Sequence, residues 1–353
     1  MLYSLSSLLF AVGLLASGAA RAGEVRFQGD GHAFHPMWST DGRYLAYEVN
    51  RYAGDVDLFI SQVSGDIVKD GVKVALPGGT GVFSGSGQVV VNPVWHKDGY
   101  VVFEGSNQGG QFRIYYRKDS GGTAAELITT TELPGDLTFP SVSPDGRTMA
   151  FVADATGSGD IRTRDTQTNQ ISQLTNSSPA EMFPSFSKDG SKLLFTRRQD
   201  GGEDVFELSV ATSTETTLVR GNGDQTRPAY AANQTIVYFD GSRGDDHWDL
   251  VSSSASGQKT LARDVQLPLR ARPAVSPDGR WVAFTYSDPE QAGKVLFARV
   301  DGSTTVEVQT GFTACGEPAI GQQGDRKFLA FTALPQSGSD WRFLYVMDVS
   351  DKI

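Results

Sequence analysis

Cysteine is almost absent from this chain, whose 353 residues include only Cys315. An internal disulfide and a metal site built from several cysteines are therefore both excluded. The four histidines are scattered through the sequence without metal-ligand spacing. The chain also lacks a G-x-S-x-G elbow, a P-loop and an H-E-x-x-H motif. We therefore expect no metal, no cofactor and no catalytic residues of an established type.

Positive charge is also in short supply, with 31 Lys and Arg against 41 Asp and Glu and a formal net charge of -10. A chain of this charge repels phosphate groups, which argues against nucleic acid and anionic membrane surfaces as partners. Charged residues are 20% of the chain and glycine is frequent, with 40 residues. This composition is typical of a globular protein with many turns.

Long apolar runs are missing except near the start, where residues 8–15 are apolar. This run is too short to span a bilayer comfortably. It is followed by Ala20-Arg21-Ala22, which has the form of a signal-peptidase site, although no Lys or Arg precedes the run. We therefore predict a signal peptide over residues 1–22 and a periplasmic or secreted mature chain, 23–353, without a transmembrane segment.

The main positive feature is an internal repeat. Its cleanest copy is residues 139–151, FPSVSPDGRTMAF, and each copy carries a proline near its start. The spacings between successive prolines are 57, 47, 44, 44, 45 and 45 residues, for Pro36, Pro93, Pro140, Pro184, Pro228, Pro273 and Pro318. A period near 45 residues is typical of one four-stranded propeller blade.

Each copy reads as a short strand, an Asp-Gly turn and further strands separated by turn signals, as in Asp145-Gly146. In the fifth copy Ala232-Asn233-Gln234 replaces Asp-Gly, and the seventh has Gln323-Gly324-Asp325. Residues 76–88 form a Gly/Ser-rich insertion, which we interpret as a long loop or hairpin. The sequence predicts an all-β, seven-bladed β-propeller of four-stranded antiparallel blades, with six blades as the alternative count.

The ends of the chain predict how the ring closes. The seventh copy ends after its third strand, residues 343–347, while residues 24–27 stand where a fourth strand should precede the first copy. We expect the N-terminal strand to complete the last blade, because closure hides open sheet edges. The alternative is a linear array with an exposed last edge.

The repeat resembles that of the TolB-type β-propeller family, best at Ser143-Pro144-Asp145-Gly146-Arg147 and Ser276-Pro277-Asp278-Gly279-Arg280. The resemblance covers nearly all of the mature chain, and it implies a fold more than a function. Similar repeats occur in periplasmic TolB, in the propellers of prolyl-oligopeptidase-like peptidases and in some polysaccharide lyases. The chain departs from TolB in lacking room for an α/β domain before the propeller and in its seven repeats against six blades. We expect no hydrolase domain after the propeller, which argues against a peptidase.

Two faces of the predicted disc differ. The Asp-Gly turns are short and alike, so we interpret their side as scaffold, whereas the opposite side carries longer, varied loops of the kind that usually bind. The candidate binding residues in those loops are Arg51, Arg198, Arg243, Asp246, His247 and Trp248. The loops are rich in acids. They are either ordinary solvated turns or a polar surface for a basic protein or a cation such as calcium.

A second candidate set is the residue before each repeat proline, which we expect at the mouth of the central channel. These residues are His35, Asn92, Phe139, Phe183, Arg227, Arg272 and Glu317. Of these, His35, Arg227, Arg272 and Glu317 could hold an anionic ligand. Alternatively, the arginines pair with neighbouring carboxylates and only tie blades together.

Three functions remain open at this stage. The first is a non-enzymatic exported scaffold that binds an envelope protein through its loop-rich face. The second is a polysaccharide lyase acting on acidic uronate polymers, in which Arg227 or Arg272 neutralises a carboxylate and His35 abstracts a proton. The third is a binding module whose channel takes a small molecule.

Overall fold

The structure is a computed structural model that describes residues 22–353, except 28, 52–53, 66, 78–86, 107–109, 120, 156, 245 and 336–339. The predicted signal peptide, apart from its last residue, lies outside the described residues, as does most of the predicted 76–88 insertion. Within the described part, no helix has the length and apolar character needed to cross a membrane.

Strands dominate the chain and fall into groups that follow one another in sequence. The first two groups contain β2 (His32–Trp38), β3 (Tyr44–Asn50), β4 (Val56–Ser64), β5 (Ile67–Val68), β6 (Val72–Lys73), β7 (Val89–His96), β8 (Tyr100–Ser106), β9 (Arg113–Lys118) and β10 (Gly121–Glu126). The next two contain β11 (Leu137–Val142), β12 (Thr148–Ala153), β13 (Asp160–Asp165), β14 (Ile171–Gln173), β15 (Glu181–Phe186), β16 (Lys192–Gln199), β17 (Gly202–Ser209) and β18 (Glu215–Val219).

The remaining strands continue the same order. They are β19 (Gln225–Tyr230), β20 (Ile236–Asp240), β21 (Asp249–Ser254), β22 (Gly257–Ala262), β23 (Ala274–Val275), β24 (Trp281–Phe284), β25 (Lys294–Arg299), β26 (Thr305–Gln309), β27 (Cys315–Gln323), β28 (Arg326–Ala333), β29 (Phe343–Asp348) and the N-terminal β1 (Gly23–Val25). Two short 3₁₀ turns, η1 (Ala232–Gln234) and η2 (Pro289–Gln291), are the helical elements of the described residues.

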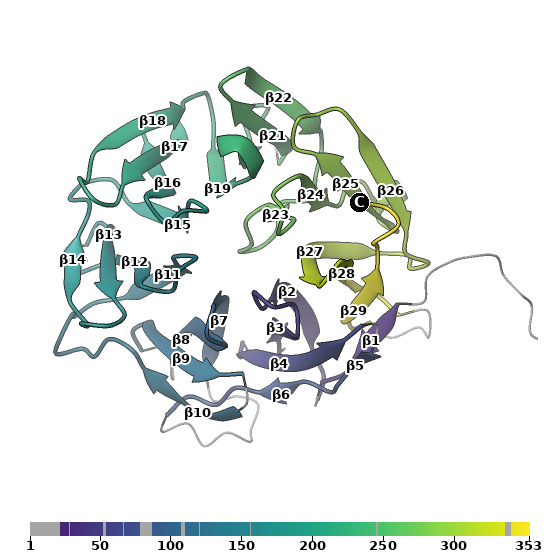
Figure 1. Cartoon of the computed structure of the whole chain (residues 1–353), viewed down its shortest axis with the longest axis horizontal. Helices are drawn as coiled ribbons and strands as arrows, with labels where there is room; N and C mark the ends of the chain where they lie inside the picture. The colour runs from purple at the N-terminus through teal and green to yellow at the C-terminus, as the bar shows by residue number, and fades with distance from the viewer. Residues whose placement is uncertain are drawn as a thin grey trace, which may run out of the picture.

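The strand groups stand around a common centre, with the first strand of each group innermost (Figure 1). The ring closes as the sequence predicts. Strand β1 pairs antiparallel with β29, placing Gly23 opposite Val346 and Val25 opposite Leu344, so the sheet order is β1-β29-β28-β27. The two ends of the chain thus share one blade, and the last blade has its fourth strand.

Five sheets of the described chain have four strands, and one has nine. The nine-stranded sheet contains the groups that begin with β2 and β7, and these are joined by a single parallel pair, Val56 with Val89. We read this sheet as two neighbouring blades that touch at one point. That reading gives each repeat proline its own blade and agrees with a count of seven.

The apolar core lies between neighbouring blades rather than within one. One cluster, for example, joins Ile114 of β9 to Phe151 of β12, and another joins Val25 and Val346 to Leu45. Tryptophans add hydrogen bonds across the same interfaces: Trp95 Nε1 donates to Met37 O over 2.9 Å. Each blade is therefore stabilised by its neighbours, so closing the ring completes the core.

The Ser-x-Asp-Gly segment of the repeat forms a hydrogen-bonded turn. In the third copy, Ser143 Oγ donates to Asp145 Oδ1 over 2.7 Å and accepts the N–H of Thr148 over 2.9 Å. Gly146 supplies the positive φ, 70°, that the turn requires. The same pattern recurs at Ser39, Ser187 and Ser276. These turns fix the angle between the first two strands of those blades.

The two departing turns keep their flanking strands. In the fifth copy, η1 holds Asn233 and Gln234 at φ 58°, so these residues take the place of the glycine conformation. In the seventh, Gly324 and Asp325 link β27 directly to β28. The predicted strands on either side of both turns are confirmed.

Candidate functional site

The residue before the repeat proline occupies a β-bulge in most copies. Six of the seven pre-proline residues have φ between 44° and 57°, and the strand register shifts at each of them: His35, Asn92, Phe139, Phe183, Arg227 and Glu317. Positive φ is costly for residues with a side chain, and bulges of this kind redirect backbone and side chain at functional places. Arg272, before the short β23, does not share this conformation.

These positions differ from the expected channel mouth. His35 is the fourth residue of β2 and Phe139 the third of β11, so both lie inside the innermost strand, at the bulge. The reason is that each of these strands begins before its proline, on the loop-rich side. The six bulged pre-proline residues therefore lie within the innermost strands and not at their first residues.

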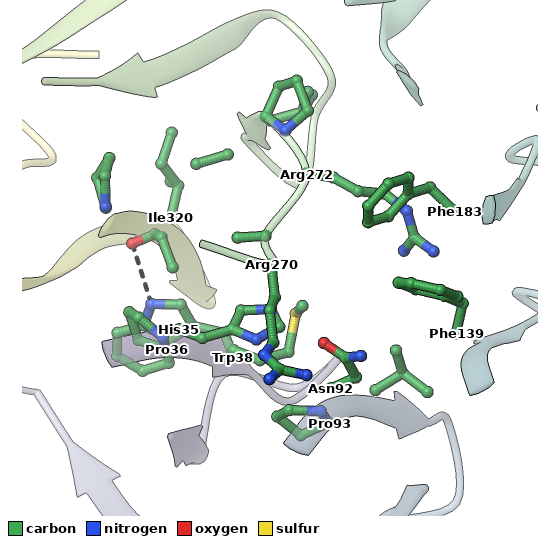
Figure 2. A pocket seen from close by; sticks show the side chains of 18 of the residues that line it. His35, Pro36, Trp38, Asn92, Pro93, Phe139, Phe183, Arg270, Arg272 and Ile320 are labelled. Atoms are coloured by element: carbon green, nitrogen blue, oxygen red, sulfur yellow. Dashed lines mark hydrogen bonds between the residues drawn. The ribbon is translucent and has the colours of Figure 1, made fainter. Parts of the chain in front are cut away.

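A cavity of about 170 Å³ lies at the centre of the ring, bounded by innermost strands and by residues 270–273. Figure 2 shows His35, Asn92, Phe139, Phe183, Arg270 and Arg272 around it. Arg227 and Glu317 do not line this cavity but contact residues that are next to it. The structure thus brings five of the seven predicted channel residues together from different blades.

A series of carboxylates binds the bulged backbone from blade to blade. Glu317 Oε2 accepts the N–H of His35 over 2.5 Å, and Glu48 Oε1 accepts the N–H of Asn92 over 2.8 Å. Glu104 Oε1 accepts the N–H of Phe139 over 2.5 Å. At these three bulges the backbone N–H thus points toward an acid of a neighbouring blade, which accepts its hydrogen bond.

Side chains complete this network. His35 Nδ1 lies 2.7 Å from Glu48 Oε1, and Asn92 Nδ2 donates to Glu104 Oε1 over 2.6 Å. Both glutamates are almost completely buried, with 0% and 2% exposure. Burial raises the pKa of Glu104 to about 7, although the hydrogen bonds from Asn92 and Phe139 oppose that shift. The imidazole of His35 is therefore held by a structural carboxylate.

Arg272 donates to a backbone carbonyl of another blade, and Arg227 donates to carbonyls of the segment between β22 and β23. Arg272 Nη2 donates to Pro184 O, across the channel, and Arg227 donates to Pro268 O and, over 3.2 Å, to Leu269 O. The Arg227 guanidinium also lies 5.3 Å from the ring centre of Phe183. Burial lowers the pKa of both arginines to about 10. Both side chains tie blades together, through carbonyls rather than the expected carboxylates.

The candidates in the outer loops are mostly paired with loop acids. Arg51 lies 3.1 Å from Asp57, and Arg198 lies 3.2 Å from Glu203. Arg243 and His247, in the loop before β21, lie 2.8 Å and 2.5 Å from Asp264, which follows β22. Trp248 packs against the core between blades, and Asp246 is exposed at φ 61°. These loop residues form one local cluster around Asp264 and two separate pairs. Among the described residues, no group of three or more His, Cys, Asp or Glu is arranged to hold a metal ion.

The sequence did not predict three residues at the centre of the ring: Glu48 and Glu104 of the hydrogen-bond network, and Arg270 of the cavity. A glutamate directly after an aromatic in an otherwise apolar strand, as in Tyr47-Glu48 and Phe103-Glu104, is a usable signal for a buried, bonded carboxylate. Arg270 carries no such signal, because it belongs to the irregular segment 263–273 between β22 and β23.

The Asp-Gly side also has a hollow, of about 770 Å³, between the turns of the blades that begin with β15, β19 and β23. Several of its charged groups are paired: Lys192 with Glu207, Arg299 with Asp301, and Asp278 with Lys327, which lies outside the lining. The hollow is consistent with space left by the missing Asp-Gly turn of the fifth copy. The channel is therefore the better candidate site.

Comparison with solved structures reveals the same architecture at low identity. TolB from Acinetobacter baumannii is 18% identical, with a TM-score of 0.56, over 88% of this chain and 64% of that one. A prolyl endopeptidase is 15% identical, with a TM-score of 0.62, over 91% and 48%. An oligogalacturonate lyase from Vibrio parahaemolyticus is 9% identical, with a TM-score of 0.59, over 94% and 91%. The chain thus spans less than two thirds of the TolB structure and about half of the endopeptidase.

These likenesses show the fold alone. In a search of curated proteins, no sequence matched the chain. A family model described as the TolB beta propeller domain matches residues 126–324, more than half of the chain and five of its seven repeat prolines. The chain therefore belongs to the TolB beta propeller domain family.

Proposed function

We propose that this protein is a non-enzymatic, exported binding protein that holds a protein partner of the cell envelope on its loop-rich face, around the channel mouth. The observation that carries the proposal is the setting of Leu269. This side chain is 61% exposed in the segment that leads into the channel wall. A partner that covers this exposed side chain would remove its apolar surface from water, which favours binding.

Leu269 is held from two sides by residues of other repeats. Its N–H donates to Glu317 Oε1 over 3.2 Å, and its carbonyl accepts from Arg227 Nη2 over 3.2 Å. These bonds order the backbone in advance, so a partner would not have to pay the entropy of fixing it. Two of the residues predicted from the repeat thus act by positioning Leu269.

Export is part of the proposal. The predicted cleavage after Ala22 would leave Gly23 at the N-terminus, and Gly23 is the first residue of the closing strand β1. Cleavage at this point would keep the whole strand. The membership in the TolB propeller family supports a periplasmic location.

The test is site-specific photo-crosslinking in cells that express the full chain. A benzophenone amino acid at Leu269 should give a discrete cross-linked protein in the envelope fraction. The matched control is the same amino acid at Lys188, which is exposed in an Asp-Gly turn. Equal cross-linking at both positions, or none at Leu269, would contradict the proposed face.

The lyase alternative finds less support in the contacts. Its proposed base, His35, is 4% exposed and bonded to Glu48, and its proposed arginines are engaged with carbonyls. One solved neighbour is an oligogalacturonate lyase in complex with manganese, so the assay should include that ion. Unsaturated products with new ultraviolet absorbance from uronate polymers would establish the lyase and overturn the non-enzymatic proposal.

A further inference from the structure

Arg270 differs from the other two channel arginines in the contacts of its side chain. Its side chain lines the central cavity, where Figure 2 shows the guanidinium near Asn92. Within the described residues it has no hydrogen bond or ion pair, and its Nε is buried without a partner. A buried polar group without a partner is costly, and this cost indicates an interaction that the chain alone does not provide. Arg227 and Arg272 also have a buried Nε without a partner, but the Nη groups of both donate to carbonyls.

The acids near the channel do not occupy that position. Glu48, Glu104 and Glu317 are absent from the cavity lining. Each instead accepts backbone N–H groups at the bulges, which spreads its negative charge over fixed donors. Glu104 has an electrostatic contact with Arg270, and burial raises the pKa of Glu104 to about 7. A molecule inside the cavity therefore meets cationic side chains first.

Another part of the wall is formed mainly by aromatic rings, with Arg272 beside them donating to Pro184 O. The rings of Phe139 and Phe183 lie 4.7 Å apart, centre to centre, and are tilted by 59°. Prolines of the repeats and Ile320 line much of the remaining wall. Cavities of about 150 Å³ hold a molecule the size of benzene, so 170 Å³ suits a ligand of about that size.

We propose that this cavity binds a small monocarboxylate that carries an aromatic or branched apolar group, with the carboxylate on the Arg270 guanidinium and the apolar group against Phe139 and Phe183. The planar guanidinium matches a carboxylate through two parallel hydrogen bonds. The site goes beyond the partner surface proposed above, since it lies inside the channel and does not use the Leu269 side chain. Two sources share this chemistry: a free acid, and the C-terminal residue of a protein.

Isothermal titration calorimetry of the full chain tests the proposal with three probes at one pH. Benzoate should bind, while benzamide, which has the same shape without the charge, should bind at least about tenfold more weakly. Acetate should also bind at least about tenfold more weakly, because it lacks the apolar group. Equal heats for benzoate and benzamide, or no heat with benzoate, would overturn the proposal without any variant.

Substitutions of Arg270 test whether benzoate binds in the central cavity. Arg270→Gln should weaken benzoate binding at least about tenfold, and Arg270→Lys should lie between it and the wild type. The matched control is Arg147→Gln, an exposed arginine in an Asp-Gly turn, which should bind like the wild type. Equal affinities for the Arg270→Gln and Arg147→Gln proteins would place benzoate elsewhere and contradict the proposal. If Arg270→Gln fails to fold, the lysine variant and the benzamide comparison still decide.

A further pair of probes separates the two sources. N-acetylphenylalanine binding more tightly than benzoate, with its amide inactive, would favour a protein C-terminus; the reverse order would favour a free acid. Failure of all carboxylates would leave the cross-linking result at Leu269 unaffected, so this inference and the proposed function can fail separately.

Discussion

Glu48 Oε1 accepts the backbone N–H of Asn92 over 2.8 Å, and the two residues lie 44 positions apart in neighbouring blades. The same oxygen lies 2.7 Å from His35 Nδ1. One completely buried carboxylate therefore satisfies a bulge in the next blade and a side chain in its own. This places the acid among the contacts that set how two blades meet.

Removing that carboxylate should destabilise the ring. Glu48→Ala leaves the Asn92 N–H and the His35 imidazole buried without partners, which should lower the free energy of unfolding by about 3 kcal/mol. Urea denaturation followed by tryptophan fluorescence measures the change. Glu290→Ala, at an exposed position, is the control and should unfold like the wild type. A wild-type midpoint for Glu48→Ala would contradict the assigned role.

The raised pKa of Glu104 predicts that the free energy of unfolding depends on pH. Its pKa is about 7 in the folded protein and ordinarily 4.5, so the folded state keeps a proton that the unfolded state loses between these values. Stability contributed by this group is therefore full below pH 4.5, falls as pH rises to about 7, and is constant above. Glu104→Gln removes the titration, so the difference in unfolding free energy between variant and wild type should change over this range. A constant difference from pH 4.5 to 7 would contradict the raised pKa.

The repeat serine should matter through its two hydrogen bonds. Ser143→Ala removes the donor to Asp145 and the acceptor for the Thr148 N–H, and should cost about 1–2 kcal/mol of stability. Thermal unfolding compares it with Thr40→Ala, an exposed change in another turn. Equal melting temperatures for the two variants would mean that the turn does not depend on these bonds.

A substitution of Val25, in the closing strand β1, tests whether ring closure stabilises the protein. Val25 is completely buried in a cluster that includes Val346 and Leu344. Val25→Asp places an unpaired charge there and should destabilise the protein by about 3 kcal/mol or more. Arg26→Ala, one residue further along and exposed, should have little effect. If both variants melt alike, β1 does not stabilise the ring.

Export gives a simple expectation for the mature chain. N-terminal sequencing of the protein isolated from the periplasm or medium should begin at Gly23, because the A-x-A site ends at Ala22. A cytoplasmic protein that retains its first 22 residues would contradict the predicted export.

The sequence predicts the strand order, the turns and the closure because each rests on local patterns repeated about every 45 residues. It does not predict the contacts at the centre. Glu48 and Glu104 occur at corresponding places in only the first two copies, and their partners lie far along the chain in the next blade. Arg270 enters the channel because β23 is only two residues long and an irregular segment replaces the start of that strand. Such contacts depend on the geometry of the assembled ring.

The most direct test of the central claim compares two single substitutions against the partner captured by cross-linking. Leu269→Asp changes the proposed anchor on the loop-rich face, and Lys188→Asp makes a matched change on the Asp-Gly face. Surface plasmon resonance should show at least about tenfold weaker binding for Leu269→Asp and wild-type binding for Lys188→Asp. Unchanged binding by Leu269→Asp, or an equal loss in both variants, would contradict the assignment of the loop-rich face.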